Sequence, residues 1–274
     1  MTTETGAQVR VAITGAAGRM GRTLVRAIGA HADCILAAAV EHGESPALGA
    51  DAGILAGVDA LGVAVVADLG DVLPGVDVVV DFTTPEATRR HAELCAEAGV
   101  AMVVGTTGLG EADEAALAAA SQKAAVVTAP NFSVGVNLAL RLVRLAAEVL
   151  GDTADIEIIE MHHRHKVDAP SGTALRMGEV VAEALDRELE VVAAHGRRGR
   201  GDPRARSAIG FHALRGGDVV GDHSVVFACE GERIEITHKA SDRMTFASGA
   251  VRAAAWAAVQ APGAYGMEAV LGLD

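Results

Sequence analysis

Residues 9–21 of the chain read Val-Arg-Val-Ala-Ile-Thr-Gly-Ala-Ala-Gly-Arg-Met-Gly, and this stretch decides the fold. Val9–Thr14 is rich in β-branched residues and runs into a glycine, which predicts a buried strand. Arg19–Ala30 follows with apolar residues at helical spacing. The glycines between them allow a tight turn, and they let backbone N–H groups approach a phosphate at the positive end of the helix. This order of strand, glycine turn and helix predicts a dinucleotide-binding unit.

Two further features support this prediction. Glu41 lies 20 residues after Gly21, at the end of a second apolar run, Cys34–Val40. An acidic residue at this place accepts hydrogen bonds from the adenosine ribose hydroxyls. A second turn, Gly105–Gly108, follows another apolar run, and ligands bind outside the carboxyl ends of strands in open sheets. The alternative is a glycine turn with an unrelated surface glutamate.

The pattern after Gly21 alternates short apolar runs with helices. Predicted strands at Val76–Phe82, Val100–Val104 and Ala125–Thr128 are separated by predicted helices at Glu86–Ala98, after Pro85, and at Glu111–Lys123. Such alternation is typical of βαβ units, so the expected fold class is α/β with a Rossmann-type, doubly wound parallel sheet. For residues 43–70 the sequence predicts only a loop and a weak strand at Val63–Val66.

The pattern changes after Asn131. A long helix at Ser133–Leu150 precedes a strand at Asp155–Met161, and two alternating runs, Ser224–Cys229 and Arg233–His238, form a predicted hairpin. We therefore expect a second, α+β domain with an open mixed or antiparallel sheet. The closing segment, Thr245–Val259, is predicted to be helical. Residues 197–206 carry five arginines among Gly and Pro and predict a mobile loop.

Composition limits the possible partners. The chain has 274 residues, of which 50% are hydrophobic and 22% charged, and its formal net charge is −13. A disordered chain is excluded, and a nucleic-acid or anionic membrane partner is not expected. Met1–Gln8 is polar and cannot be the apolar core of a signal peptide, and no apolar run is long enough for a membrane span. The three cysteines (Cys34, Cys95 and Cys229) are expected to be reduced, buried thiols in the cytosol.

The most unusual stretch is Glu160–Thr173, in which five consecutive residues, 162–166, can carry positive charge. A cation cluster at a strand end, followed by a helix N-terminus at Ser171–Thr173, predicts a site for an anion such as a carboxylate. Lysine and histidine side chains can also donate protons there. Two alternatives remain open. One is a solvated charge run, and the other is a metal site of His162, His163 and His165, for which no completing ligand cluster is visible.

With these motifs the chain resembles the 4-hydroxy-tetrahydrodipicolinate reductase (dihydrodipicolinate reductase) family over essentially its whole length. The resemblance rests on the stretches already quoted and on three more. These are Asp81–Thr83, Asn131–Asn137 and Ile236–Ser241.

The resemblance implies a reduction of a small cyclic dicarboxylate in the cytoplasm, with NADH and/or NADPH as cofactor and no bound metal. It implies a homotetramer assembled through the open sheet of the second domain. It also implies that the chain returns to the first domain from about residue 240. The expected domains are therefore residues 1–132 with 240–274, which bind the dinucleotide, and residues 133–239, which bind substrate and form the oligomer.

The resemblance also assigns roles to residues. His162 corresponds to the family's proton donor and acceptor, and Lys166 to its proton donor. The implied substrate contacts are His163, Gly172 and Thr173. The implied cofactor contacts are Gly15, Ala16, Ala17, Gly18, Arg19, Met20, Glu41, Gly105, Thr106, Thr107, Ala129, Pro130, Asn131 and Phe132. His42 joins them, at a position where members that use NADPH well commonly carry arginine.

Two other classes of protein share parts of this pattern. A semialdehyde or glyceraldehyde-phosphate type of dehydrogenase needs a cysteine nucleophile at a helix N-terminus. Cys34 is expected at a strand start, Cys95 inside a helix and Cys229 in a β run, so none fits. A nucleotide-sensing regulator that binds DNA would need a basic recognition helix, and the net charge argues against one.

Overall fold

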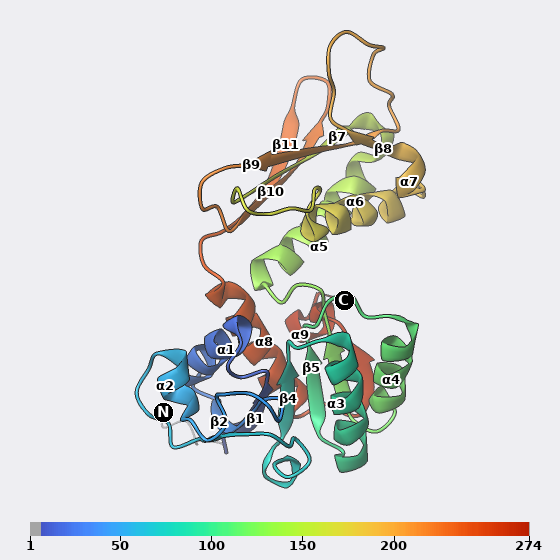
Figure 1. Cartoon of the computed structure of the whole chain (residues 1–274). Helices are drawn as coiled ribbons and strands as arrows, with labels where there is room; N and C mark the ends of the chain where they lie inside the picture. Colours follow the sequence, from blue (N-terminus) through green and yellow to red (C-terminus); the bar gives the residue numbers. More distant parts are fainter. Residues whose placement is uncertain (1–6, 274) are drawn as a thin grey trace, which may run out of the picture. The chain divides into compact units, whose positions relative to one another are not determined.

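A computed structural model describes residues 7–273 of the chain, so most of the polar segment Met1–Gln8 lies outside the described residues (Figure 1). The chain divides into two compact units. The first unit comprises Met1–Val134 and Met244–Asp274, and the second comprises Gly135–Arg243. The first unit is therefore built from two separated stretches of sequence.

The first unit contains a seven-stranded sheet in which every pairing is parallel. Its order is β12-β6-β5-β4-β1-β2-β3, and the switch of direction beside β1 is that of a Rossmann-type fold. The middle strands are mainly apolar because both faces of the sheet are covered. The strands are β1 Val9–Thr14, β2 Cys34–Val40, β3 Val65–Val66, β4 Val78–Asp81, β5 Ala101–Val104, β6 Ala125–Thr128 and β12 Gly263–Tyr265.

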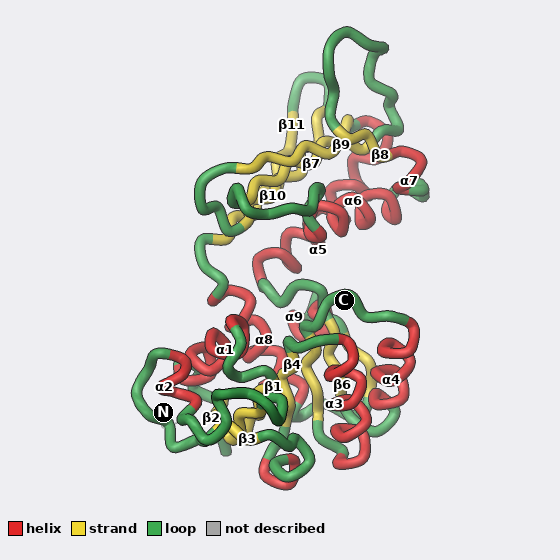
Figure 2. Tube along the Cα trace, in the orientation of Figure 1, coloured by secondary structure: helices red, strands yellow, loops and turns green. Residues whose placement is uncertain are grey.

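Helices cover the two faces of this sheet with separate apolar cores (Figure 2). Helix α1 (Arg19–Gly29) and the late helix α8 (Met244–Ala257) pack on one face, and α3 (Pro85–Ala98) and α4 (Glu111–Ser121) pack on the other. Short helices α2 (Ala52–Ala56) and α9 (Met267–Leu271) complete the core of the first face. The expected doubly wound parallel sheet is thus confirmed.

In the segment 43–70 the expected weak strand is present in part, and the expected loop contains a short helix. Only Val65–Val66 pairs as strand β3, and a short helix, α2, precedes it. The Asp51 carboxylate caps α2 and also accepts the N–H groups of Leu61 and Gly62, at 3.1 and 2.7 Å. These backbone hydrogen bonds, that of Leu61 above all, lower the pKa of Asp51. One carboxylate therefore organises a segment that has no hydrophobic period to reveal it.

The second unit is a five-stranded sheet with helices on one face. Its order is β11-β10-β7-β9-β8, with β10 antiparallel to both neighbours and β9 parallel to β7 and β8, so the expected mixed sheet is confirmed. Helices α5 (Val134–Leu150) and α6 (Gly172–Ala184) supply the apolar core against it. The remaining elements are β7 Asp155–His162, α7 Leu189–Val192, β8 Ala193–His195, β9 Ile209–Arg215, β10 Gly221–Ala228 and β11 Arg233–Ala240.

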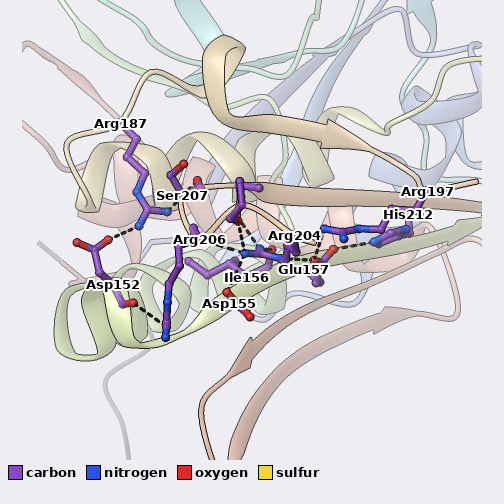
Figure 3. Close-up of polar contacts among 12 residues, drawn as sticks. Asp152, Asp155, Ile156, Glu157, Arg187, Arg197, Arg204, Arg206, Ser207 and His212 are labelled. Atoms are coloured by element: carbon purple, nitrogen blue, oxygen red, sulfur yellow. Dashed lines mark hydrogen bonds and ion pairs between the residues drawn. The ribbon is translucent and has the colours of Figure 1, made fainter. Parts of the chain in front are cut away.

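The arginine-rich segment 197–206 has no helix or strand, as expected, but Arg204 fastens it to the sheet (Figure 3). Its guanidinium pairs with Glu157 and Asp155, at 2.8 and 2.9 Å, and donates to the carbonyl oxygens of Ile156 and Ala208. His212 reaches the same Glu157 carboxylate at 2.7 Å. This arginine therefore serves the fold and does not belong to an open cationic surface.

The cysteines differ in burial. Cys34 and Cys95 are buried, whereas Cys229 is half-buried just beyond β10, so the expectation of three buried thiols is wrong for Cys229. Burial raises the pKa of Cys34 to about 11 and that of Cys95 to about 12. Thiols in this state are poor nucleophiles. No helix among residues 7–273 is long and apolar enough to cross a membrane.

Candidate functional site

The glycine turn joins β1 to α1 in the first unit. Gly15 has φ = +65°, a value that suits glycine, and Gly18 precedes the first residue of the helix. At Gly21 a Cβ atom would lie 2.2 Å from the carbonyl oxygen of Gly15, so only glycine lets the helix pass this close to the turn. The Glu41 carboxylate accepts the N–H of Ala17 at 2.9 Å. The acidic residue at the end of β2 therefore lies against the turn, which is the arrangement that an adenosine ribose requires.

A cavity of about 790 Å³ opens beside this turn, within the first unit. Four of the residues assigned to the cofactor line it, and they are Gly15, Gly18, Glu41 and His42. Phe82 and Thr83, after β4, line it as well. A dinucleotide fits a cleft of this size and lining. The other assigned residues of the turn, Ala16, Ala17, Arg19 and Met20, are not among the lining residues.

The remaining residues assigned to the cofactor lie around the ends of β5 and β6. Gly105 leaves room for the ring of Phe82, since a Cβ atom there would lie 2.1 Å from that ring. Phe132 packs on Phe82 with ring centroids 5.5 Å apart. Thr106 is buried, whereas Thr107 is exposed, and neither lines the cavity. The stretch Ala129–Phe132 also lies outside the cavity lining.

Asp81, at the end of β4, organises this region and was not assigned a role from the sequence. Its fully buried carboxylate contacts His91 at 2.5 Å and accepts hydrogen bonds from Thr83, Thr88 and Thr106. Burial alone would raise the pKa of Asp81, but the His91 contact and the hydrogen bonds from Thr83 hold it below its usual range. Asp81 thus ties the turn after β4 to the turn after β5. The sequence did contain a signal for this role, which is an acidic residue at the end of an apolar run predicted to be a buried strand.

The second unit places the cation cluster at the end of β7. His162 is the last residue of the strand, and its Nδ1 lies 2.6 Å from the carboxylate of Glu160. Lys166 follows in the loop, where its ammonium contacts both carboxylate oxygens of Asp168, at 2.9 and 2.7 Å. His163 and His165 have ring centroids 6.1 Å apart. Asp168 therefore forms an ion pair with the lysine. The sequence analysis gave Asp168 no role.

The helix N-terminus expected after this loop is present. Ser171 caps α6 by accepting the N–H of Ala174, and α6 begins at Gly172. Helix geometry directs the N–H groups of the first turn, including those of Gly172 and Thr173, toward the N-terminal end. The positive end of the helix dipole adds to the charge of the cluster. This arrangement suits a carboxylate.

Glu160 begins the stretch quoted from the sequence but was given no role there, and Arg215 was not predicted at all. Arg215 donates to both carboxylate oxygens of Glu160, at 2.7 and 2.8 Å, although 55 residues separate the two. The period-2 alternation of β7 could have placed Glu160 beside His162 on one face. Arg215 gave no local signal. Among residues 7–273, no three His, Cys, Asp or Glu side chains lie close enough to hold a metal ion.

A Rossmann-type unit with a nucleotide cleft, joined in one chain to a unit with a cation cluster at a helix N-terminus, defines a pyridine-nucleotide-dependent oxidoreductase. Comparison with known proteins identifies the family within this class. The family model for the N-terminus of dihydrodipicolinate reductase matches residues 9–132, and that for its C-terminus matches residues 135–271. The chain belongs to the dihydrodipicolinate reductase family.

Individual relatives agree with this membership. The chain is 57% identical over 265 residues to a 4-hydroxy-tetrahydrodipicolinate reductase of Acinetobacter baumannii, which covers 97% of both chains. It is 58% identical over 264 residues to the enzyme of the same name from Alkalilimnicola ehrlichii, covering 96% of this chain and 99% of the relative. The structure of a dipicolinate-bound dihydrodipicolinate reductase from Paenisporosarcina sp. matches with a TM-score of 0.77 and 27% identity, over 96% of this chain and 99% of that one. The family resemblance found in the sequence is confirmed.

Proposed function

We infer that this chain reduces 4-hydroxy-tetrahydrodipicolinate to tetrahydrodipicolinate by hydride transfer from NADH or NADPH, a step of diaminopimelate and lysine biosynthesis. The observation that carries this inference is the cation cluster of His162–Lys166 leading to the N-terminus of α6, in a chain of this family. The substrate is a small cyclic dicarboxylate, which such a cluster attracts. We place the reaction in the cytoplasm. The first unit binds the dinucleotide, and the second binds the substrate.

The residues of the second unit have different roles in the reaction. A cofactor bound in the cleft of the first unit would supply the hydride. The 4-hydroxyl group leaves as water, and the hydride adds to the ring carbon that is then electron-poor because it is conjugated to a C=N group. The Lys166 ammonium stabilises the negative charge that develops and donates a proton to it. His162 accepts and returns a proton. His163, Gly172 and Thr173 hold a carboxylate of the substrate, with backbone N–H groups and the Thr173 hydroxyl as donors.

A steady-state assay with enzymatically generated substrate tests the function. We expect substrate-dependent oxidation of NADH or NADPH, followed at 340 nm. Thiol alkylation of the folded protein should leave the rate unchanged, because Cys34 and Cys95 are buried and no thiol step is required. Activity lost on alkylation in step with modification of one cysteine would instead indicate the thiol-dependent class of dehydrogenase.

We expect the enzyme to show no strong preference for NADPH over NADH. The Glu41 carboxylate lies against the glycine turn, where it pairs with free ribose hydroxyls and repels a 2′-phosphate. His42 lines the same cavity, where its ring lacks the paired donors that an arginine guanidinium would offer to a 2′-phosphate. We expect kcat/KM with NADH to be at least as high as with NADPH, and His42→Arg to shift the ratio toward NADPH. A kcat/KM more than tenfold higher with NADPH in the unaltered protein would contradict this.

We propose that the open face of the second unit's sheet assembles the chain into a homotetramer. On the face of β7 and β9 opposite α5 and α6, Ile159 and Leu214 are 38% and 46% exposed. Ser224 and Thr237 add a hydrogen-bonded polar pair across β10 and β11. Apolar side chains within a broad sheet face are typical of a subunit interface.

The assembly is tested with Ile159→Arg, which places a charge in the centre of that face. We expect light scattering to show the tetramer falling to smaller species, while far-UV circular dichroism stays unchanged. Val191→Arg is the matched control, since Val191 is 75% exposed but belongs to α7. An unaltered tetramer in Ile159→Arg, or dissociation in Val191→Arg alone, would place the interface elsewhere.

A further inference from the structure

Glu160 is an ionisable group buried beside the proposed proton carrier. Only 1% of the residue is exposed, and its carboxylate takes four contacts. Arg215 donates two hydrogen bonds, the N–H of Ser171 donates one at 3.1 Å, and His162 contacts it through Nδ1 at 2.6 Å. Burial would raise the pKa of Glu160, but the Arg215 and His162 contacts hold it below the usual value. The carboxylate is therefore ionised at neutral pH.

An ionised carboxylate can only accept hydrogen bonds, so the contact fixes the hydrogen on the His162 ring. Nδ1 must carry it, which leaves Nε2 as the nitrogen that gains and loses a proton. Within residues 7–273, Nε2 has no hydrogen-bond partner, and 11% of the side chain is exposed. Gly221 keeps this nitrogen uncovered, because a Cβ atom there would lie 3.0 Å from Nε2.

The neighbouring histidine does not compete for this proton. The ring of His223 meets that of His162 edge-on, with centroids 5.1 Å apart. Burial, with a smaller effect of the His162 charge, lowers the pKa of His223 to about 4. His223 is held by Ser171, whose hydroxyl lies 2.8 Å from its Nε2. His223 is thus neutral in the pH range where His162 works.

We propose that Glu160 is a positioning residue for the reduction, one that holds His162 in the Nδ1–H form with Nε2 presented for proton transfer. The proposal deepens the proposed function and rests on its role for His162. Arg215 helps to hold this arrangement, because it donates hydrogen bonds to both carboxylate oxygens of Glu160. It also donates to the backbone carbonyl of Asp168 at 2.6 Å. The carboxylate therefore links the orientation of His162 to the loop that carries Lys166.

Glu160→Gln is the first test, because an amide has the same shape but can offer an N–H group to Nδ1. We expect kcat to fall roughly 10- to 100-fold, as is usual when an orienting partner is lost. The dissociation constants of NADH and of pyridine-2,6-dicarboxylate, a planar dicarboxylate probe, should stay within about threefold. In ¹⁵N-histidine-labelled protein, the His162 resonances should show hydrogen at Nδ1 in the unaltered chain and a shift toward Nε2 in the variant.

Glu157→Gln is a matched control on the same strand. Glu157 likewise pairs with an arginine and a histidine, Arg204 and His212 (Figure 3). It lies three residues before Glu160, so the alternation of the strand puts it on the opposite face of the sheet. This variant loses a comparable set of contacts, so it should lower the melting temperature without changing the His162 resonances or lowering kcat more than about threefold. Glu160→Asp keeps the charge opposite Arg215 but draws the carboxylate back, and it should lose part of kcat while remaining folded.

A double-mutant cycle decides whether Glu160 acts through His162. In a His162→Gln background, Glu160→Gln should lower kcat no further, because the group that it positions is gone. An equal loss in both backgrounds, or a kcat within twofold of the unaltered value in folded Glu160→Gln, overturns the proposal. Full kcat in His162→Gln alone would remove the assigned role of His162, which is a failure of the proposed function. The His162 resonances would still report whether Glu160 selects the ring form.

Discussion

Replacing Lys166 with alanine, or His162 with glutamine, should lower kcat by about 10²–10⁴-fold, the usual range for a general acid or base. Lys166 supplies a permanent cation that offsets charge as hydride adds, and its ammonium is held by Asp168 at the end of the loop. His162 supplies an imidazole ring that can accept and return a proton. NADH affinity, measured by fluorescence titration, should be retained because the glycine turn belongs to the other unit.

The alternative is that the cluster only attracts the dicarboxylate. In that case both variants would raise KM and keep kcat within a few-fold of the unaltered value at saturating substrate. Lys123→Ala is a suitable control, since it removes the same charge from an exposed position in the first unit and should change neither constant. If both kcat values were unchanged, the cluster would keep an anion-binding role and lose its catalytic one.

Gly21→Ala should weaken nucleotide binding and destabilise the first unit. The new methyl group would lie 2.2 Å from the Gly15 carbonyl oxygen and 2.7 Å from the Cα of Ala16, both of which are backbone atoms that cannot swing aside. Helix α1 must then move away from the turn. We expect the NADH dissociation constant to rise at least tenfold and the free energy of unfolding to fall by roughly 1–3 kcal/mol, as in overpacked cores.

Gly29→Ala provides the control in the same helix. Gly29 is the last residue of α1, and a Cβ atom there has no neighbour within 4 Å. Alanine favours a helix more than glycine does, so this variant should be at least as stable as the unaltered chain and bind NADH equally well. If Gly21→Ala behaved like Gly29→Ala in thermal melts and NADH titrations, the tight crossing of helix and turn would not be needed for cofactor binding.

The sequence predicts much of the first unit because its signals are local. The β-branched strands, the glycine turn and Pro85 at the start of α3 each reveal an element within a few residues, and the expected strands at Val9–Thr14 and Cys34–Val40 match the observed ones. Elements that depend on long-range contacts cannot be predicted from such local signals. Helix α2 depends on one carboxylate, and β9 pairs with a strand that lies about 50 residues earlier in the sequence.

The same distinction holds for the candidate site. The cation run and the cap at Ser171 are continuous in sequence, so the strand end and the helix start could be predicted together. Arg215 reaches Glu160 only because β9 pairs with β7 in a register that places Arg215 beside His162. That register depends on sheet pairing across 55 residues, which no period or motif reports. Asp81 is similar, since its partners come from three separate segments.

The return of the chain to its first unit has a consequence for synthesis on the ribosome. Helix α8 contributes buried alanines and Val251 to the core that also holds Val11, Ile13 and Val80, yet the whole second unit is made between them. At usual elongation rates this delay is on the order of ten seconds. Throughout that time one face of the nascent parallel sheet carries α1 but lacks α8, the second long helix that covers it. The growing chain therefore presents an apolar surface that a chaperone can hold, and the inserted unit is free to fold before the unit that began first.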